Sequence, residues 1–262
     1  LAFDRVLITT YPITNYPSIV WTLPPGEGRK VVVAKFADNA LNASADVTRS
    51  IVVSDVTPPL FTSAAGPSGW LTAVTQTLTA TAQDDVSGLN ASSAMVRISP
   101  NGGVTWTAWL SASMAASAQG SVQPQIVSAT IRFPTDSANW RAQFRIADAH
   151  GFTATSSLIA LMIDSTPPTQ TVIASSLVSP TNLISVTWSA SDTVSGVAGY
   201  DAQVREGITG TWTGWLTNTT QTGALFEGQT GRAYAFRVRA RDMAGNLSVF
   251  TAEDAGAVTL VP

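Results

Sequence analysis

The sequence predicts an all-β protein made of tandem antiparallel β-sandwiches arranged as a rod, with the first sandwich incomplete. Three observations predict this fold class. A junction of the form Asp-x-Thr-Pro-Pro occurs twice, at residues 55–59 and 164–168. A run of alternating apolar and polar residues, typical of a half-buried strand, precedes each junction. No segment has a convincing helical period.

Each junction is interpreted as a semi-rigid connector between modules. Two consecutive prolines fix φ and lack amide hydrogens, so they cannot continue a central strand. The junctions divide the chain into residues 1–57, the C-terminal part of a sandwich, 58–166, a complete sandwich, and 167–262, a further sandwich.

A hairpin centred on an Asp ends each module. Its first strand is expected at residues 30–38, 140–148 and 234–242, and its second at 48–53, 158–163 and 257–261. Apolar residues alternate with Lys35, Arg145 and Arg239 in the first strands, which indicates one buried and one solvated face.

The first module is shorter before its hairpin than the other two, so we expect part of its sandwich to be missing. An exposed apolar face and an unpaired strand edge are features that isolated proteins avoid. Two explanations remain open: a longer tandem array, or another subunit that donates strands to residues 1–57. The spacing from Asp242 to Pro262 repeats the spacing from hairpin to junction, so Pro262 is expected to begin a further junction.

Modules two and three share further motifs. An acidic Gly turn occurs at residues 84–88 and 192–196, and a Trp-rich strand at 105–110 and 211–216. Regularly spaced short strands and turns favour a β-sandwich. The Ala/Ser-rich stretch 111–119 is expected to be a loop.

Residues 186–192, 199–205 and 234–242, with Gly245-Asn246, resemble a fibronectin type III module. The first two segments resemble the bacterial immunoglobulin-like repeats of large extracellular surface or filament proteins, which also end in Asp-x-Thr-Pro-Pro. The resemblance implies architecture and leaves function open, since such sandwiches act as spacers, adhesins and filament subunits. The family's tyrosine-corner position is Tyr234 in module three but Trp140 and Lys30 in the others.

The acidic turns are candidate metal sites. In a seven-strand sandwich, the acidic turn and the last hairpin of each module lie at the pole where the chain enters that module. Oxygen ligands clustered there would suit Ca²⁺, which takes six to eight of them. The alternative is that each Asp caps its own turn through backbone hydrogen bonds. The candidate ligands are Asp55, Asp84, Asp85, Asp148, Asp164, Asp192, Asp242 and Asn246.

The Trp pairs 106/109 and 212/215 are spaced by three, so on a regular strand their rings point to opposite faces. One ring of each pair is expected in the core, and Trp109 and Trp215 are candidates for contact with a sugar or a neighbouring subunit. Sequons make four asparagines candidate glycan attachment sites: Asn42, Asn90, Asn218 and Asn246.

Composition limits the classes of function. Charged residues make up only 12% of the chain, the net charge is −3, and Lys30 and Lys35 are the only lysines, so neither nucleic acid nor an anionic membrane is an expected partner. No apolar run approaches the roughly 20 residues that span a bilayer. The absence of cysteine excludes thiol nucleophiles and disulfides. The single histidine, His150, is expected to be exposed in a turn, and no catalytic residue or organic cofactor is predicted.

These features favour a structural segment of an extracellular filament, surface layer or adhesin. It would act by spacing and by association with other copies or other surface proteins, without catalysis. The alternative is a carbohydrate-binding accessory module of a secreted hydrolase. The Ser/Thr-rich, lysine-poor composition favours an extracellular or cell-surface location in both cases.

Overall fold

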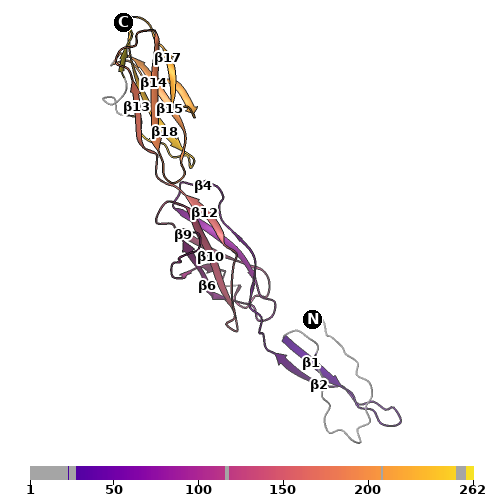
Figure 1. The fold of residues 1–262 in the computed structure, drawn as a ribbon. Coiled ribbons are helices and arrows are strands. Elements are labelled where there is room, and N and C mark those ends of the chain that lie inside the picture. Colours follow the sequence, from indigo (N-terminus) through magenta and orange to yellow (C-terminus); the bar gives the residue numbers. More distant parts are fainter. Residues whose placement is uncertain (1–22, 24–27, 116–117, 208, 252–257) are drawn as a thin grey trace.

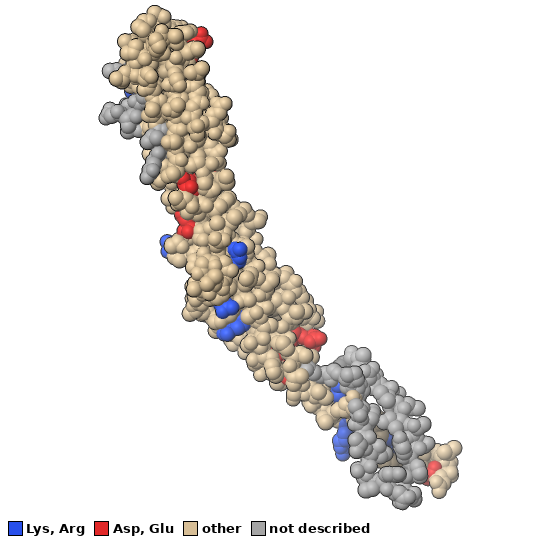
Figure 2. Space-filling view, in the orientation of Figure 1, with Lys and Arg blue, Asp and Glu red and all other residues tan. Residues whose placement is uncertain are grey.

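The computed structural model describes residues 23, 28–115, 118–207, 209–251 and 258–262. A β-hairpin and two β-sandwiches follow one another along an elongated chain (Figure 1). Charged side chains are sparse on the face drawn in Figure 2. Within the described ranges, no helix has the length and apolar character needed to cross a membrane.

The hairpin is the described part of the first module. Strand β1 (Gly28–Ala34) pairs antiparallel with β2 (Val47–Val53). The turn between them follows Asp38, as the sequence predicted, and includes Leu41 with φ 67°. Residues 1–22 and 24–27, which belong to the predicted first module, lie outside the described residues.

Residues 60–163 form a sandwich of two sheets. All strand pairs are antiparallel except β4 with β12, which is parallel. One sheet has the order β3 (Leu60–Ala65), β5 (Thr75–Gln83), β9 (Gln125–Arg132), β8 (Ser113–Met114). The other has the order β4 (Trp70–Leu71), β12 (Ile159–Ile163), β10 (Ser137–Asp148), β6 (Leu89–Ser99), β7 (Leu110–Ser111), and β11 (Thr153–Thr155) pairs with β10.

The core of this sandwich follows the predicted period of two. On β10, Ala142, Phe144 and Ile146 are fully buried. Trp140, also buried on β10, packs edge-on against Phe133 with ring centroids 5.1 Å apart, and its indole N–H donates to the carbonyl of Thr135 at 3.0 Å. The prediction of a loop at residues 111–119 was wrong in part, because Leu110–Ser111 and Ser113–Met114 add short strands to opposite sheets.

Residues 169–260 form the second sandwich, again from two sheets. One has the order β13 (Thr169–Ser175), β14 (Leu183–Ser191), β17 (Gly223–Glu227). The other has the order β16 (Thr213–Thr219), β15 (Val197–Glu206), β18 (Ala233–Asp242), β19 (Val258–Leu260).

Tyr234 occupies the corner position that the sequence assigned to it. It is buried, and its hydroxyl accepts the backbone N–H of Gln229 at 3.0 Å, five residues upstream. In the preceding sandwich, the indole of Trp140 bonds to Thr135, also five residues upstream. The indole of Trp140 therefore takes the place of the phenol of Tyr234, but the direction of the hydrogen bond is reversed. The indole donates to a backbone carbonyl, whereas the phenol accepts from a backbone N–H.

Candidate metal centres at the module junctions

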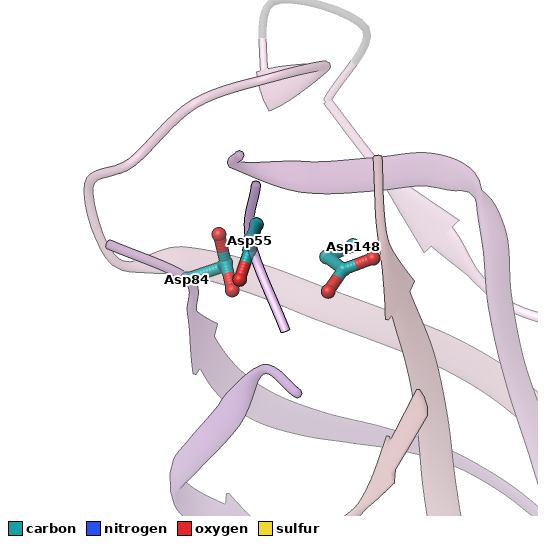
Figure 3. Close-up of side chains that lie close together, drawn as sticks. All are labelled: Asp55, Asp84 and Asp148. Carbon is teal, nitrogen blue, oxygen red and sulfur yellow. The ribbon is translucent and has the colours of Figure 1, made fainter. Parts of the chain in front are cut away.

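Two groups of three aspartates lie at the two junctions. In each group, one carboxylate oxygen of every residue lies within 4.8 Å of the others. The first group is Asp55, Asp84 and Asp148, which gather in one place in Figure 3, and the second is Asp164, Asp192 and Asp242.

The same elements position both groups. Asp55 lies in the connector between β2 and β3, Asp84 directly follows β5, and Asp148 is the last residue of β10. In the second group, Asp164 directly follows β12, Asp192 directly follows β14, and Asp242 ends β18. A connector residue, a turn residue and a hairpin residue therefore meet at each junction, as the predicted pole of the sandwich requires.

Each Asp of a turn or hairpin also caps its own turn through its Oδ1 atom. The Oδ1 of Asp84 accepts from the backbone N–H of Gly88 at 2.7 Å, and that of Asp192 accepts from Gly196 at 2.7 Å. Gly88 has a φ of 78°, and an added Cβ would lie 2.3 Å from the backbone of Gly120. Glycine at this turn position is therefore required by both conformation and space.

The connector aspartates also bond to the module that follows. The Oδ2 of Asp55 accepts the backbone N–H of Ser87 at 3.1 Å, and the Oδ2 of Asp164 accepts that of Ser195 at 3.0 Å. These bonds attach the connector to the acidic turn. Of the two alternatives that the sequence suggested, the turn-capping bonds are present, and the carboxylates of each group also lie close together.

Burial makes the charge of these groups costly. Asp55, Asp84, Asp148, Asp164 and Asp242 are each at most 3% exposed, and Asp192 is half-buried. In the described part of the chain, neither Lys nor Arg forms an ion pair with Asp84, Asp148, Asp192 or Asp242. Buried carboxylates need a compensating charge or hydrogen-bond donors, since they have left water.

One oxygen in the first group lacks any such compensation. Among the described residues, no group donates a hydrogen bond to the Oδ2 of Asp148, although this residue is fully buried. Its Oδ1 accepts the backbone N–H groups of His150 at 2.8 Å and Phe152 at 2.9 Å. A buried carboxylate oxygen without a donor is the kind of atom that a cation satisfies.

The geometry of the two groups fits Ca²⁺. Oxygens that bind one Ca²⁺ at about 2.4 Å cannot lie more than about 4.8 Å apart. The candidate ligand oxygens of each group meet that limit. Hard oxygen donors without His or Cys are the ligand set that Ca²⁺ prefers. Ca²⁺ binding at these junctions remains a prediction.

Two of the predicted ligands behave differently. Asp85 is exposed and does not belong to the group. Asn246 does lie at the second junction, where its amide nitrogen donates to the Oδ2 of Asp242 at 2.8 Å and to the carbonyl of Asp164 at 2.9 Å. A glycan on this nitrogen would displace one of those two bonds. Among the other sequons, Asn42 and Asn218 are exposed and Asn90 is half-buried.

A further aspartate fixes the second connector. Asp136, in the segment between β9 and β10, accepts from the hydroxyl of Ser165 at 2.9 Å and from that of Thr166 at 2.6 Å. Burial acts to raise the pKa of Asp136, but the hydrogen bonds from Thr166 and Ser165 outweigh it and hold the pKa below its ordinary value. Nothing in the sequence motif indicated this contact, since Asp136 belongs to no repeat.

The Trp-rich segments form stacks with arginine. Arg97 lies over the rings of Trp106 and Trp109 at 4.3 and 4.6 Å, and Arg145 lies over Trp109 at 4.6 Å. Both rings of this pair thus lie against the arginine side chains, contrary to the prediction that one enters the core. Residues 101–109 are not a regular strand, so the alternation of faces does not apply to them.

In the last module, the two Trp rings have different surroundings, but Trp215, which was the candidate for a surface contact, is the ring on the core side. Trp215 is partly buried and packs against the core, 5.4 Å from Phe236 and 5.9 Å from Trp188 between ring centroids. Trp212 is instead contacted by Arg205 at 4.5 Å and Arg237 at 4.4 Å. Packing against the core covers part of the Trp215 ring, and the guanidinium groups over Trp109 and Trp212 cover part of theirs, so all three rings have less face for a sugar or a neighbouring subunit.

His150 is exposed in the hairpin turn after β10, and its backbone N–H is the group that bonds to Asp148.

Comparison with known proteins yielded structural neighbours alone. No protein-family model matches the chain, and no curated protein matches it. A segment of titin domains is 13% identical, with a TM-score of 0.45, over 90% of this chain and 75% of the titin chain. Fibronectin(III)-like modules of CbhA from Clostridium thermocellum are 12% identical, with a TM-score of 0.30, over 78% of this chain and 93% of theirs. The FN1–FN3 domains of chicken CNTN1 are 14% identical, with a TM-score of 0.28, over 86% of this chain and 76% of theirs.

These likenesses are too distant to transfer a function. The fold class follows from the sheets of the chain itself, whose strands pair antiparallel except for β4 with β12 and form two-sheet sandwiches with the strand orders given above. The chain is an all-β array of immunoglobulin-like and fibronectin III-like sandwiches.

Proposed function

We propose that the chain is a structural segment of an extracellular filament, surface layer or adhesin, which acts by spacing and by subunit association without catalysis. Divalent cations, with Ca²⁺ as the expected ion, stiffen its junctions. One observation supports the proposal most: a connector aspartate joins two aspartates of the next module at both junctions.

The mechanism follows from where the ligands come from. Asp55 and Asp164 belong to the connectors, whereas the other two aspartates of each group belong to the sandwich. A cation that binds all three oxygens adds a link between connector and sandwich to the hydrogen bonds from Ser87 and Ser195. The two prolines that follow each connector aspartate already limit the flexibility of the chain. A bound cation would therefore hold successive modules in line.

Electron microscopy of the purified chain tests the proposal. We expect straight particles in Ca²⁺, particles bent at the junctions after chelation, and end-to-end or lateral association at high concentration. Compact particles of one shape in both buffers, with no association, would refute a role in spacing. Binding on a glycan array that is lost in Trp212→Ala would instead support the carbohydrate-binding alternative.

A further inference from the structure

The fourth residue after the hairpin Asp distinguishes the three hairpin turns. Each turn begins with an Asp, and the residue four positions later is Asn42 in the first, Phe152 in the second and Asn246 in the third. In all three turns, the backbone N–H of that residue donates to the Oδ1 of the Asp, at 2.9, 2.9 and 2.8 Å. The three turns therefore share this backbone bond, whereas the side chain at this position differs in chemistry.

The asparagine side chains bond to the second carboxylate oxygen. The Nδ2 of Asn42 donates to the Oδ2 of Asp38 at 2.9 Å, and the Nδ2 of Asn246 donates to the Oδ2 of Asp242 at 2.8 Å. In the first turn, this side-chain bond is the main cause that lowers the pKa of Asp38. The amide thus acts as a built-in donor to a charged group.

Phe152 cannot provide this donor. It is 40% exposed, and the Oδ2 of Asp148 is buried with no hydrogen-bond partner in the described structure. The unsatisfied oxygen is therefore found in the turn whose fourth residue lacks a side-chain amide.

The missing donor would lie at the junction. In the third turn, the Nδ2 of Asn246 bonds at the same time to the carbonyl of Asp164, the connector aspartate. The Oδ2 side of the hairpin Asp therefore faces the connector. By equivalence with the third turn, the Oδ2 of Asp148 is expected to face the connector that contains Asp55, and one carboxylate oxygen of Asp148 lies within 4.8 Å of those of Asp55 and Asp84.

We propose that the two junctions are held by different means. A divalent cation closes the first junction, at Asp55, Asp84 and Asp148, whereas the side-chain amide of Asn246 closes the second and competes with a cation there. This inference rests on the proposed cation-stiffened array and adds that the two sites are unequal. The ion must displace the amide from Asp242 at the second junction, but it meets no such donor at Asp148.

Calorimetric titration of the metal-free 262-residue chain with CaCl₂ tests the inference. We expect one tight site that is lost in Asp148→Asn and retained in Asp242→Asn. The asparagine in Asp148→Asn keeps an oxygen for the bonds from His150 and Phe152, so the turn is preserved. Asp85→Asn, which removes an adjacent exposed carboxylate, is the matched control and should bind as the wild type does.

Two further variants test the role of the amide directly. Phe152→Asn introduces the donor at the first junction and should weaken Ca²⁺ binding there about tenfold or more, as expected for competition with a hydrogen bond to a charged group. Asn246→Ala removes the donor at the second junction and should strengthen the weak site by a similar factor. Because Phe152 is exposed, its replacement is expected to leave the fold intact, which a melting curve checks.

The outcomes separate this inference from the proposed function. Two sites of equal affinity, or a tight site lost in Asp242→Asn but not in Asp148→Asn, would overturn the assignment of the tight site to the first junction. Either result would leave the cation-stiffened array standing. An unchanged affinity in Phe152→Asn would also overturn it. No Ca²⁺ binding at either junction would overturn this inference and also the role of cations in the proposed function. Particle shape in the electron microscope would then test the spacer role by itself.

Discussion

Removal of Ca²⁺ should lower the thermal stability of the sandwich that contains Asp84 and Asp148. Their candidate ligand oxygens and that of Asp55 lie within 4.8 Å of one another. With an effective dielectric constant of about 20, two unit charges 4.8 Å apart repel by about 3.5 kcal/mol. The three pairs together would cost about 10 kcal/mol before relaxation, which a bound dication offsets.

The measured change is limited by ligand linkage. A cation at about 100 times its Kd stabilises the folded state by about 2.7 kcal/mol. A change of 1 kcal/mol shifts the melting temperature of a domain of this size by about 4 °C or more. Chelation should therefore lower the melting temperature by about 10 °C.

Differential scanning calorimetry at constant ionic strength measures this shift. In Asp148→Asn, the transition of residues 58–166 should no longer respond to chelation, whereas in Asp85→Asn it should respond as in the wild type. Identical melting temperatures of the wild type in millimolar Ca²⁺ and in chelator would refute the metal centre.

Three more predictions follow from the contacts. Asp136→Asn should lower the melting temperature near neutral pH, because the folded-state pKa of Asp136 lies below its unfolded-state pKa. The carboxylate therefore stabilises the fold above the unfolded-state pKa, and this contribution is lost as pH falls through the folded-state pKa. Melting curves of variant and wild type should converge at that acidic limit; a constant difference would contradict the assignment. Tyr234→Phe removes the bond between the buried hydroxyl of Tyr234 and the backbone N–H of Gln229 and should cost about 1 kcal/mol in urea unfolding, and an unchanged midpoint would contradict the corner contact. Trp215→Ala should destabilise the last module by about 3 kcal/mol, and Trp212→Ala by clearly less, since the ring of Trp215 packs against the core aromatic residues whereas that of Trp212 is contacted by arginines; equal losses would contradict that placement.

Where strand alternation was regular, the sequence predicted side-chain placement well. Phe144 and Phe236 are fully buried on the hairpin strands, as their spacing from Asp148 and Asp242 indicated. The Trp pairs show where this reasoning fails. Trp106 lies in an irregular segment, so a period of two could not place it.

The candidate metal groups were predicted in part. The repeat placed Asp84 and Asp148 at the same pole, and the structure brings them together with Asp55. The sequence could not tell which of Asp84 and Asp85 belongs to the buried group, because both are adjacent acids in the same turn. Asp136 was not predicted either, since its partners lie about 30 residues away in the sequence.

The sequence by itself determined the modular order of this protein, because repeats, proline junctions and strand alternation are local patterns that one chain displays along its length. The tertiary structure alone decided the chemistry of the junctions. The change from Asn246 to Phe152 is visible in the sequence, but its consequence is an unsatisfied oxygen on Asp148. That consequence depends on burial and on the direction of one carboxylate, and both are fixed only when a connector, a turn and a hairpin meet.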